Sequence, residues 1–348
     1  MIKYLGSKRR LVPELTSLFQ ASGARTALDL FTGTTRVAQA FKRAGAQVTA
    51  VDCTRFAAVF AACYVATDAD TVDGRALDGA VAALNAEPPR PGYVTETFSR
   101  RSRFFQPHNA ARIDAVRDAI ARDFAGTELE PVLLTSLIEA ADRVDSTTGV
   151  QMAYVKKWAP RSYRHLELQV PPLLSGPGRS VRGDACVLAG SLGEFDFAYL
   201  DPPYNQHRYE ANYHVWETVV AWDAPEAYGV ACKRAEIRAG ERSPFNSRRT
   251  MPAALAKVVS EVRAGTVVLS YNDESFLTLD ELIDICAVRG YVEVLSYPSA
   301  RYVGARIGIH NPAGQRVGTV GRLHNLEYVL VAGDRADVRR AVRPLRSA

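Results

Sequence analysis

The residues from Leu200 to Asn205, LDPPYN, place a carboxylate, two prolines and an aromatic ring next to one another. The preceding run FDFAYL, which begins at Phe195, is apolar and aromatic, and this predicts a buried strand. Two prolines permit neither a helix nor a continued strand ladder, so the chain must leave the sheet at Asp201. Ligands of open α/β sheets bind beyond the carboxyl ends of strands, which makes this stretch a candidate site.

The chemistry that suits this stretch is transfer to an exocyclic amine. The Asp201 carboxylate and the Pro202 carbonyl can accept the two hydrogens of an amino group, and Tyr204 offers a face for a flipped base. Pro202 and Pro203 restrict the backbone, so the site is organised before substrate arrives. An Asp-Pro-Pro run alone is usually an ordinary turn, because both residue types form turns. The complete Asp-Pro-Pro-Tyr after an apolar strand favours the catalytic interpretation.

A second region has the pattern of a nucleotide-binding βαβ unit. Strands are predicted over residues 26–31 and 47–51 and a helix over 36–44, with the small residues TGTT in the first loop. Asp52 follows the second strand about 20 residues after Gly33, the spacing of a carboxylate that binds ribose hydroxyls. With one glycine instead of G-x-G-x-x-G, the loop indicates a nucleotide-type ligand and not a dinucleotide.

Two other places could contact such a ligand. Tyr4 and Lys8 flank a Gly6-Ser7 turn, and together could hold a ring and a carboxylate; a solvated basic N-terminus is the alternative. Asp184 follows a glycine at the end of a predicted strand. It could accept a hydrogen bond from an adenine amine, or could act only as a turn former.

The middle of the chain has a different composition. A proline-rich linker is predicted at 87–92 and helices over 109–124 and 131–145, while residues 151–182 carry six Lys or Arg against one Glu. Basic residues among aromatics suit a nucleic-acid face, and a solvated helical surface with core aromatics is the alternative. With a basic loop at 233–249, the residues expected to contact DNA are Arg100, Arg101, Arg103, Lys156, Lys157, Arg161, Arg164, Arg208, Arg242, Arg248 and Arg249.

Composition limits the class of protein. The chain has 348 residues, 47% hydrophobic and 23% charged, as in ordinary globular proteins. We see no apolar run near the roughly 18 residues of a membrane span and no signal-peptide pattern, so we expect a cytoplasmic protein with no membrane partner. The five cysteines form no C-x-x-C pair, which favours free thiols over a metal site. A net charge of +5 permits a nucleic-acid partner without requiring one.

The order of the predicted elements indicates an α/β fold. Strands and helices alternate at both ends of the chain, and residues 91–178 form a mainly helical insertion. The chain returns to the sheet near Val181. Two late strands, predicted over 291–297 and 326–332, close the sheet as an antiparallel pair at its edge.

Taken together, the motifs resemble those of the alpha-group DNA adenine N6-methyltransferases over nearly the whole chain. The start, KYLGSK, is similar to that family's aromatic followed by G-G-K, and DLFTGTT at 29–35 is similar to its F-x-G-x-G loop. Asp52 matches the ribose-binding acid, and DPPY the catalytic motif. Two glycines of the family pattern are replaced, by Ser7 and by Thr35, and Thr35 adds a Cβ near the methionine end of the cofactor.

This resemblance implies a Rossmann-like methyltransferase sheet in residues 1–90 and 179–348, with 91–178 as an inserted target-recognition region. It implies S-adenosylmethionine as cofactor, adenine in double-stranded DNA as substrate, and an in-line transfer that needs no metal. It leaves open whether a cognate restriction endonuclease is a partner. The implied catalytic residues are Asp201, Pro202, Pro203 and Tyr204. The implied cofactor-binding residues are Tyr4, Lys8, Asp29, Phe31, Gly33, Thr34, Thr35, Asp52, Asp184 and Asp201.

Two other classes of function stay open at this point. One is an amine methyltransferase that acts on RNA, on cytosine N4 or on protein glutamine, since related proline-tyrosine motifs serve those reactions. The long basic helical insertion favours duplex DNA over these. The other is a DNA-binding protein that keeps the fold without catalysis, and the complete Asp201 to Tyr204 motif argues against it.

Overall fold

The computed structural model describes residues 2–152, 154–155, 157–204, 206, 208–240, 242–300, 309–310, 316–318 and 324–346. The chain forms two compact units. Unit 1 consists of Met1–Thr16, Arg25–Ala185 and His207–Arg242, and unit 2 of Ser17–Ala24, Cys186–Gln206 and Ser243–Ala348. The strand order is β3-β2-β1-β4-β7-β11-β8 in a seven-stranded sheet, which confirms the expected α/β fold.

The first unit contains most of the described helices. The residues of α1 (Val12–Ser22) are divided between the two units. Its other elements, in chain order, are η1 (Lys8–Arg10), β1 (Thr26–Asp29), α2 (Arg36–Arg43), β2 (Gln47–Asp52), α3 (Arg55–Ala61), η2 (Ala62–Ala66), α4 (Gly74–Ala86), α5 (Tyr93–Thr95), η3 (Glu96–Arg100), α6 (Pro107–Asp123), α7 (Glu130–Val144), η4 (Pro160–Tyr163), β3 (Gly178–Arg182), α9 (Tyr209–Asn212), α10 (His214–Ala221), β5 (Ala227–Tyr228), β6 (Lys233–Arg234) and α11 (Ala235–Ala239).

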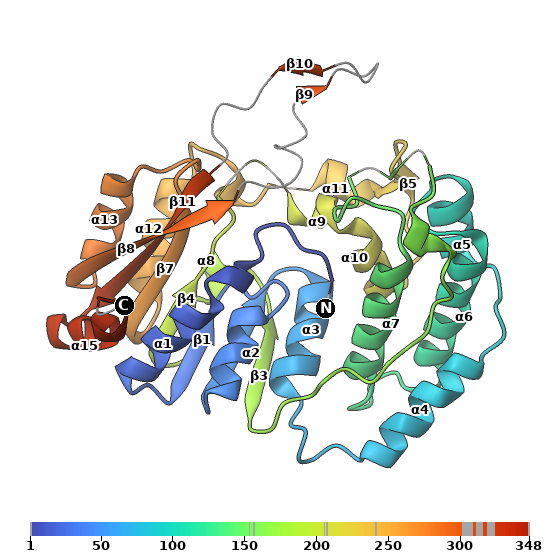
Figure 1. Cartoon of the computed structure of the whole chain (residues 1–348), viewed down its shortest axis with the longest axis horizontal. Coiled ribbons are helices and arrows are strands. Elements are labelled where there is room, and N and C mark those ends of the chain that lie inside the picture. The colour runs from blue at the N-terminus through green and yellow to red at the C-terminus, as the bar shows by residue number, and fades with distance from the viewer. Residues whose placement is uncertain are drawn as a thin grey trace. The chain divides into compact units, whose positions relative to one another are not determined.

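The second unit carries the long strands of the C-terminal part (Figure 1). Its elements are α8 (Ala185–Leu188), whose first residue still belongs to unit 1, β4 (Phe195–Leu200), η5 (Pro244–Asn246), α12 (Met251–Glu261), β7 (Ala264–Asn272), α13 (Leu279–Ala287), β8 (Tyr291–Ala300), β9 (Ile309–His310), β10 (Arg316–Gly318), β11 (His324–Gly333) and α15 (Arg335–Arg346).

One strand of the sheet, β11, runs antiparallel to both of its neighbours. In unit 1, β1 pairs in parallel with β2, and β2 in parallel with β3. In unit 2, β4 pairs in parallel with β7, whereas β11 runs antiparallel to both β7 and β8. The predicted closing pair of antiparallel strands is therefore confirmed. Parallel strands end at the same edge, so Asp29, Asp52 and Asp184 of unit 1 all lie at or just beyond carboxyl ends of neighbouring strands.

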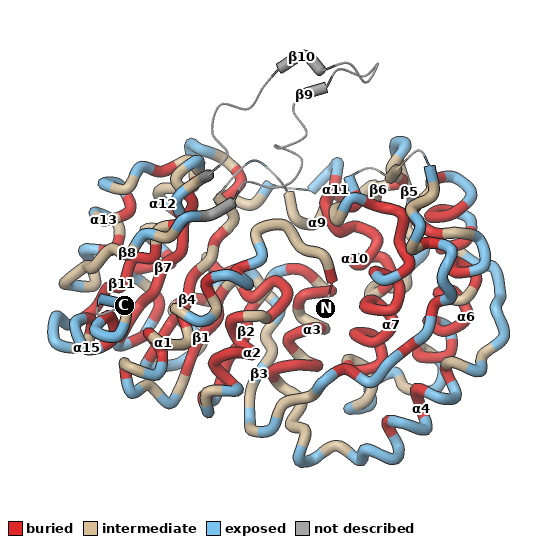
Figure 2. Tube along the Cα trace, in the orientation of Figure 1, coloured by how far each residue is buried: buried red, intermediate tan, exposed pale blue. Residues whose placement is uncertain are grey.

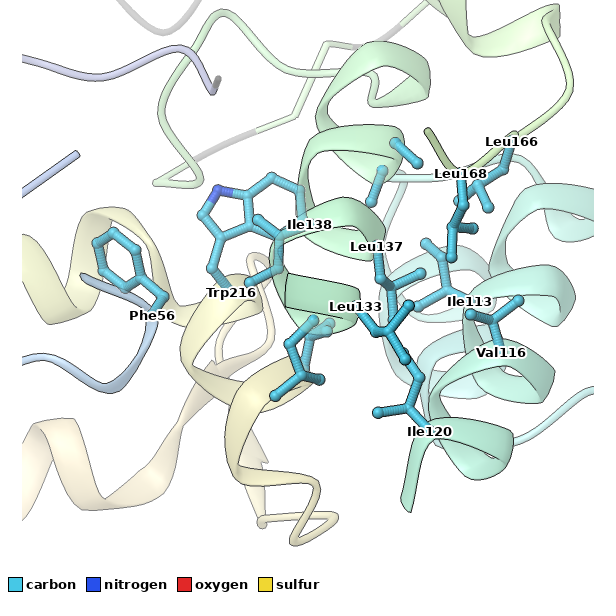
Figure 3. Close-up of a cluster of buried hydrophobic side chains, with 14 of the residues drawn as sticks. Phe56, Ile113, Val116, Ile120, Leu133, Leu137, Ile138, Leu166, Leu168 and Trp216 are labelled. Atoms are coloured by element: carbon cyan, nitrogen blue, oxygen red, sulfur yellow. The ribbon is translucent and has the colours of Figure 1, made fainter. Parts of the chain in front are cut away.

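An extended hydrophobic cluster lies in unit 1, where the helices of residues 91–178 pack on α3 and α10 (Figure 3). Apolar residues repeat on α6 at Ile113, Val116 and Ile120, a spacing that places them on one helical face. Each is fully buried, and burial of a side chain of this size stabilises the folded protein by roughly 1.5–3 kcal/mol. Phe56 and Trp216 belong to the same cluster. Figure 2 shows that α7 is buried along nearly its whole length.

Buried polar side chains fasten the loops of this helical region. The Asp114 carboxylate on α6 accepts hydrogen bonds from the backbone nitrogens of Gly92, Val94 and Thr95, each at 2.8 Å, and so holds the start of α5. Asn109 donates to the carbonyls of Ser162 and Arg164 at 3.1 and 2.8 Å. Paired in this way, the buried groups avoid the penalty of desolvation. Among the described residues, no helix is long and apolar enough to cross a membrane.

Candidate active site

The Asp29 carboxylate holds the loop after β1 through hydrogen bonds. This residue is 1% exposed, and its Oδ2 accepts hydrogen bonds from Thr32 Oγ1 at 2.9 Å and from the backbone nitrogen of Ala38 at 3.1 Å. A bond at 2.9 Å from the Thr32 nitrogen to the Val51 carbonyl joins the loop to β2. Asp29 therefore shapes the loop. Phe31 is half-buried and Thr34 buried in the same loop.

Two residues of this loop have left-handed backbone conformations. Gly33 has φ 50° and Thr35 has φ 62°. A residue with a Cβ is strained there by about 1 kcal/mol. Thr35 is nonetheless fully buried, and its Oγ1 accepts a hydrogen bond from Gln39 Nε2 at 2.8 Å. The backbone thus keeps the form that glycine favours, although threonine stands in the family's glycine position.

Tyr4 lies over the glycine of the loop. A Cβ added at Gly33 would come within 3.0 Å of the Tyr4 hydroxyl and 3.1 Å of its ring. The Tyr4 ring stacks on Tyr213 at 4.8 Å between centroids and on Tyr209 at 5.4 Å. The Tyr213 hydroxyl accepts a hydrogen bond at 2.6 Å from the backbone nitrogen of Leu5. The N-terminal segment is therefore packed in place, and Lys8 within it is buried.

Lys3 fastens the same segment to the end of α7. Its Nζ lies 2.9 Å from Asp142 Oδ2 and 3.3 Å from Asp145 Oδ1. Burial raises the pKa of Asp142 to about 6, although Lys3 acts in the opposite direction. Arg161, predicted to contact DNA, donates from Nε to Asp145 Oδ1 at 2.7 Å and from Nη2 to the Thr147 carbonyl at 2.6 Å. Its guanidinium therefore pairs with the Asp145 carboxylate, which Lys3 also contacts.

Asp52 ends β2 as predicted and holds both neighbouring loops. Its Oδ1 accepts hydrogen bonds from Thr54 N at 2.9 Å and Thr54 Oγ1 at 2.8 Å, and its Oδ2 accepts one from Gly33 N at 2.9 Å. Burial raises the pKa of Asp52, while these hydrogen bonds act to lower it. A carboxylate oxygen has two acceptor sites, so Oδ2 can accept a further donor such as a hydroxyl.

Asp184 lies beside the end of β2. It is exposed and follows Gly183, whose backbone nitrogen donates to the Asp52 carbonyl at 3.0 Å. Asp52 and Asp184, both predicted to bind the cofactor, thus lie at or just beyond the ends of two adjacent parallel strands. The arrangement offers acceptors at one sheet edge of unit 1.

Glu217 is a residue of this region that the sequence did not reveal. It lies on α10, and its Oε1 accepts a hydrogen bond at 3.0 Å from the backbone nitrogen of Phe56 in the first turn of α3. A carboxylate is favourable at a helix N-terminus. Burial raises the pKa of Glu217, and Arg55 at 3.5 Å opposes that rise. The contact joins residues 161 positions apart, and no local pattern indicates it.

In unit 2, the motif that begins at Asp201 directly follows β4 as predicted. Asp201 is half-buried and Pro202 is buried. Ser270 of β7 donates a hydrogen bond from Oγ to Asp201 Oδ1 at 3.2 Å. The Tyr204 ring contacts the ring of Tyr271 at 5.8 Å between centroids with 63° between the planes, and Tyr271 is fully buried. The end of β7 thus contacts both the carboxylate and the aromatic residue of the motif.

The basic residues predicted to contact DNA differ in their surroundings. Arg100 pairs with Glu96, Arg103 stacks over Trp158, and Arg208 binds both Glu210 and the Ile237 carbonyl. Side chains that are exposed belong to Arg100, Arg101, Lys157, Arg164, Arg242, Arg248 and Arg249. Lys156 lies outside the described residues. Across the part of the chain that is described, no group of three or more His, Cys, Asp or Glu is arranged to hold a metal ion.

Known proteins resemble the chain in sequence. It is 27% identical over 322 residues to the modification methylase StsI of Streptococcus sanguinis, over 86% of this chain and 49% of that protein. It is also 27% identical over 300 residues to the type II methyltransferase M.NlaIII of Neisseria lactamica, over 82% and 87%. For M.CviAII of Paramecium bursaria Chlorella virus 1, identity is 30% over 210 residues, covering 59% and 62%.

The chain spans about half the length of StsI. A family model described as D12 class N6 adenine-specific DNA methyltransferase matches residues 4–244, a stretch that runs from Tyr4 through the Asp201 to Tyr204 motif. The chain therefore belongs to the family of D12 class N6 adenine-specific DNA methyltransferases.

Proposed function

We propose that the protein transfers a methyl group from S-adenosylmethionine to the N6 amine of adenine in duplex DNA. The observation that carries the proposal is the Asp-Pro-Pro-Tyr motif at the carboxyl end of β4, in a chain that the family model matches from residue 4 to residue 244. A carboxylate, a rigid carbonyl and an aromatic face are the groups that an extruded adenine requires.

The motif residues would act on the base in distinct ways. Asp201 and the Pro202 carbonyl would accept hydrogen bonds from the two N–H groups of the amine and so direct the nitrogen lone pair away from them. Positive charge develops on that nitrogen during transfer, and the nearby carboxylate stabilises it. Pro203 keeps the turn rigid, and Tyr204 stacks on the extruded ring, an interaction worth roughly 1–3 kcal/mol.

S-adenosylmethionine would supply an electrophilic methyl group on a sulfonium. In unit 1, Asp52 would accept from the ribose hydroxyls, and Asp184 from the adenine amine of the cofactor. Lys8 would bind its carboxylate. The loop of Asp29, Phe31, Gly33, Thr34 and Thr35, with Tyr4 packed over Gly33, would contact its methionine end. The remaining acceptor capacity of Asp52 Oδ2 supports this fit.

Residues 91–178 would recognise the DNA target, and the exposed basic residues would bind phosphates, which fix position without reading sequence. The fastened loops at Asp114 and Asn109 support a rigid recognition surface. Since relatives carry the names of modification methylases and type II methyltransferases, we propose that a restriction endonuclease of the same specificity accompanies this protein.

The decisive experiment identifies the methylated product. The protein is incubated with cofactor that carries a tritiated methyl group and, in separate reactions, with unmethylated bacterial DNA, total RNA and a glutamine-containing peptide. Digestion and chromatography then identify the labelled nucleoside. We expect N6-methyladenine from duplex DNA only, and Asp201→Ala should remove it.

Other outcomes select the alternatives. Label in N4-methylcytosine, RNA or glutamine would replace adenine in DNA by that substrate. Tight DNA binding with no label in any reaction, and no heat of cofactor binding by calorimetry, would leave a non-catalytic DNA-binding protein.

A further inference from the structure

Two buried hydroxyl groups stand behind Asp201. Tyr199 lies on β4 two residues before Asp201, the spacing that places side chains on the same face of a strand. Ser270 lies on β7, where Leu200 pairs with Leu269, so the next residue on each strand is Asp201 and Ser270. The Tyr199 hydroxyl and Ser270 Oγ are 2.8 Å apart, and Ser270 Oγ is 3.2 Å from Asp201 Oδ1.

The number of hydrogens that each group can donate determines the direction of these hydrogen bonds. An ionised carboxylate has none, and a serine hydroxyl has one hydrogen with two acceptor sites. Ser270 must therefore donate its hydrogen to Asp201 and accept the bond from Tyr199. Ser270 is 0% exposed and Tyr199 1%, so water does not compete with the bond between them, whereas the bond to the half-buried Asp201 is partly buried. Hydrogen bonds in such surroundings are stronger than in water and polarise one another.

We propose that Ser270, supported by Tyr199, is a positioning residue that sets the rotamer of the Asp201 carboxylate for the target amine. This inference rests on the proposed function, because it concerns how that carboxylate faces its substrate. By holding Oδ1, Ser270 determines the direction in which the carboxylate presents an acceptor. The donor is neutral, so it orients Asp201 without cancelling the negative charge that the developing positive nitrogen needs.

The strand pairing makes this position rigid. Ser270 is flanked by β4 on one side and by β11 on the other, where it pairs with Val329. A serine in the interior of a paired strand cannot shift without breaking ladder bonds. Orientation of a reacting group by fixed neighbours is a large part of catalytic rate, and a small misplacement reduces it strongly.

The test combines three variants with a matched control. Ser270→Ala removes the donor, Tyr199→Phe removes only the supporting hydroxyl, and Asp201→Ala removes the carboxylate itself. Thr266→Val is the control, because it deletes a buried hydroxyl from the same strand, four residues from Ser270. Each protein is assayed with tritiated S-adenosylmethionine and unmethylated bacterial DNA from pH 5.5 to 8.5, after thermal melting shows that it folds.

We expect Ser270→Ala to lower kcat about 10- to 100-fold, the usual effect of a lost hydrogen bond to a charged group. The KM for the cofactor and the affinity for DNA should stay unchanged. The acidic limb of the pH–rate profile should move to higher pH, because loss of a donor favours the protonated carboxyl. Tyr199→Phe should cause a smaller fall of about 2- to 5-fold in the same direction. Thr266→Val should retain activity.

The outcomes separate this inference from the proposed function. If Asp201→Ala keeps its activity, the proposed function is wrong. If Asp201→Ala is inactive while Ser270→Ala and Tyr199→Phe keep the native kcat and acidic limb, the positioning role is overturned. A rate loss in Ser270→Ala that appears in KM, with no movement of the acidic limb, would also overturn it. If Ser270→Ala does not fold, Tyr199→Phe decides the question alone.

Discussion

The two carboxylates proposed to serve the cofactor and the substrate are held in different ways. Asp52 receives hydrogen bonds from Thr54, two residues further along, and from the Gly33 backbone of the neighbouring loop. Asp201 accepts a hydrogen bond from Ser270, which is 69 positions away in an adjacent strand. The first arrangement arises from loops that close on one carboxylate, and the second depends on the register of two strands.

This difference suggests a division of tasks. A group that binds a ligand can be oriented by its own turn, because binding tolerates small adjustments. A group that must act on a reacting nitrogen needs a fixed direction, and a buried strand supplies it. Substitutions at the two carboxylates and at their neighbours test this comparison.

Loss of the Asp201 carboxylate should have the largest effect. Asp201→Ala should reduce the single-turnover methylation rate by about 10²–10³, as removal of one preorganised electrostatic contact does. DNA affinity should change little, because phosphate contacts dominate it. Quenched-flow assays and fluorescence anisotropy measure the two quantities. A rate within twofold of the native protein would show that Asp201 has no part in the chemistry.

Loss of the Asp52 carboxylate should affect binding and not the chemical step. Asp52→Ala should weaken S-adenosylmethionine binding by about 1–3 kcal/mol, since a charged hydrogen-bond partner is lost. The single-turnover rate should recover at saturating cofactor, in contrast to Asp201→Ala. Calorimetry supplies the affinity, and a rate that stays low at saturation would contradict the comparison.

The packing of Tyr4 on Gly33 should contribute less. Gly33→Ala and Gly45→Ala both place a Cβ on a left-handed backbone, with φ of 50° and 90°. At Gly45 nothing lies within 4 Å of the added atom, whereas at Gly33 the ring of Tyr4 must move. Both variants should lose about 1 kcal/mol of unfolding free energy. Only Gly33→Ala should weaken cofactor binding, by several-fold in calorimetry; equal binding by both variants would separate Tyr4 from the cofactor site.

The pH dependence of cofactor binding should be the mildest effect. Burial raises the pKa of Asp52 above its ordinary value, and the ionised form is the better acceptor for hydroxyls. Affinity should therefore be full at pH values above that raised pKa, and should fall as pH decreases through it by at most about tenfold per pH unit. Asp52→Asn should flatten the dependence. A native profile that matches the profile of Asp52→Asn would mean that Asp52 does not bind the cofactor.

Local patterns in the sequence determined the order of the motifs and the ends of the strands that carry them. Apolar runs predicted the strands that end at Asp52 and just before Asp201, because burial and chain-breaking residues act over a few neighbouring positions. The strand predicted over 26–31 ends two residues earlier in the structure, at Asp29. The motifs also indicated the family, which the family model confirms. Apolar residues at helical spacing equally predicted the two long helices α6 and α7.

Only the tertiary structure decided which side chains meet. Ser270 behind Asp201, Glu217 at the start of α3 and Tyr4 over Gly33 all join distant segments, and strand pairing and helix packing create those contacts without a local signal. Charge shows the same limit, since a count of basic residues does not reveal that Arg161 pairs with Asp145. The sequence determines which groups are present and approximately where each element ends. The partner of each group depends on long-range packing, because the energy of a contact depends on two segments that are distant in the sequence.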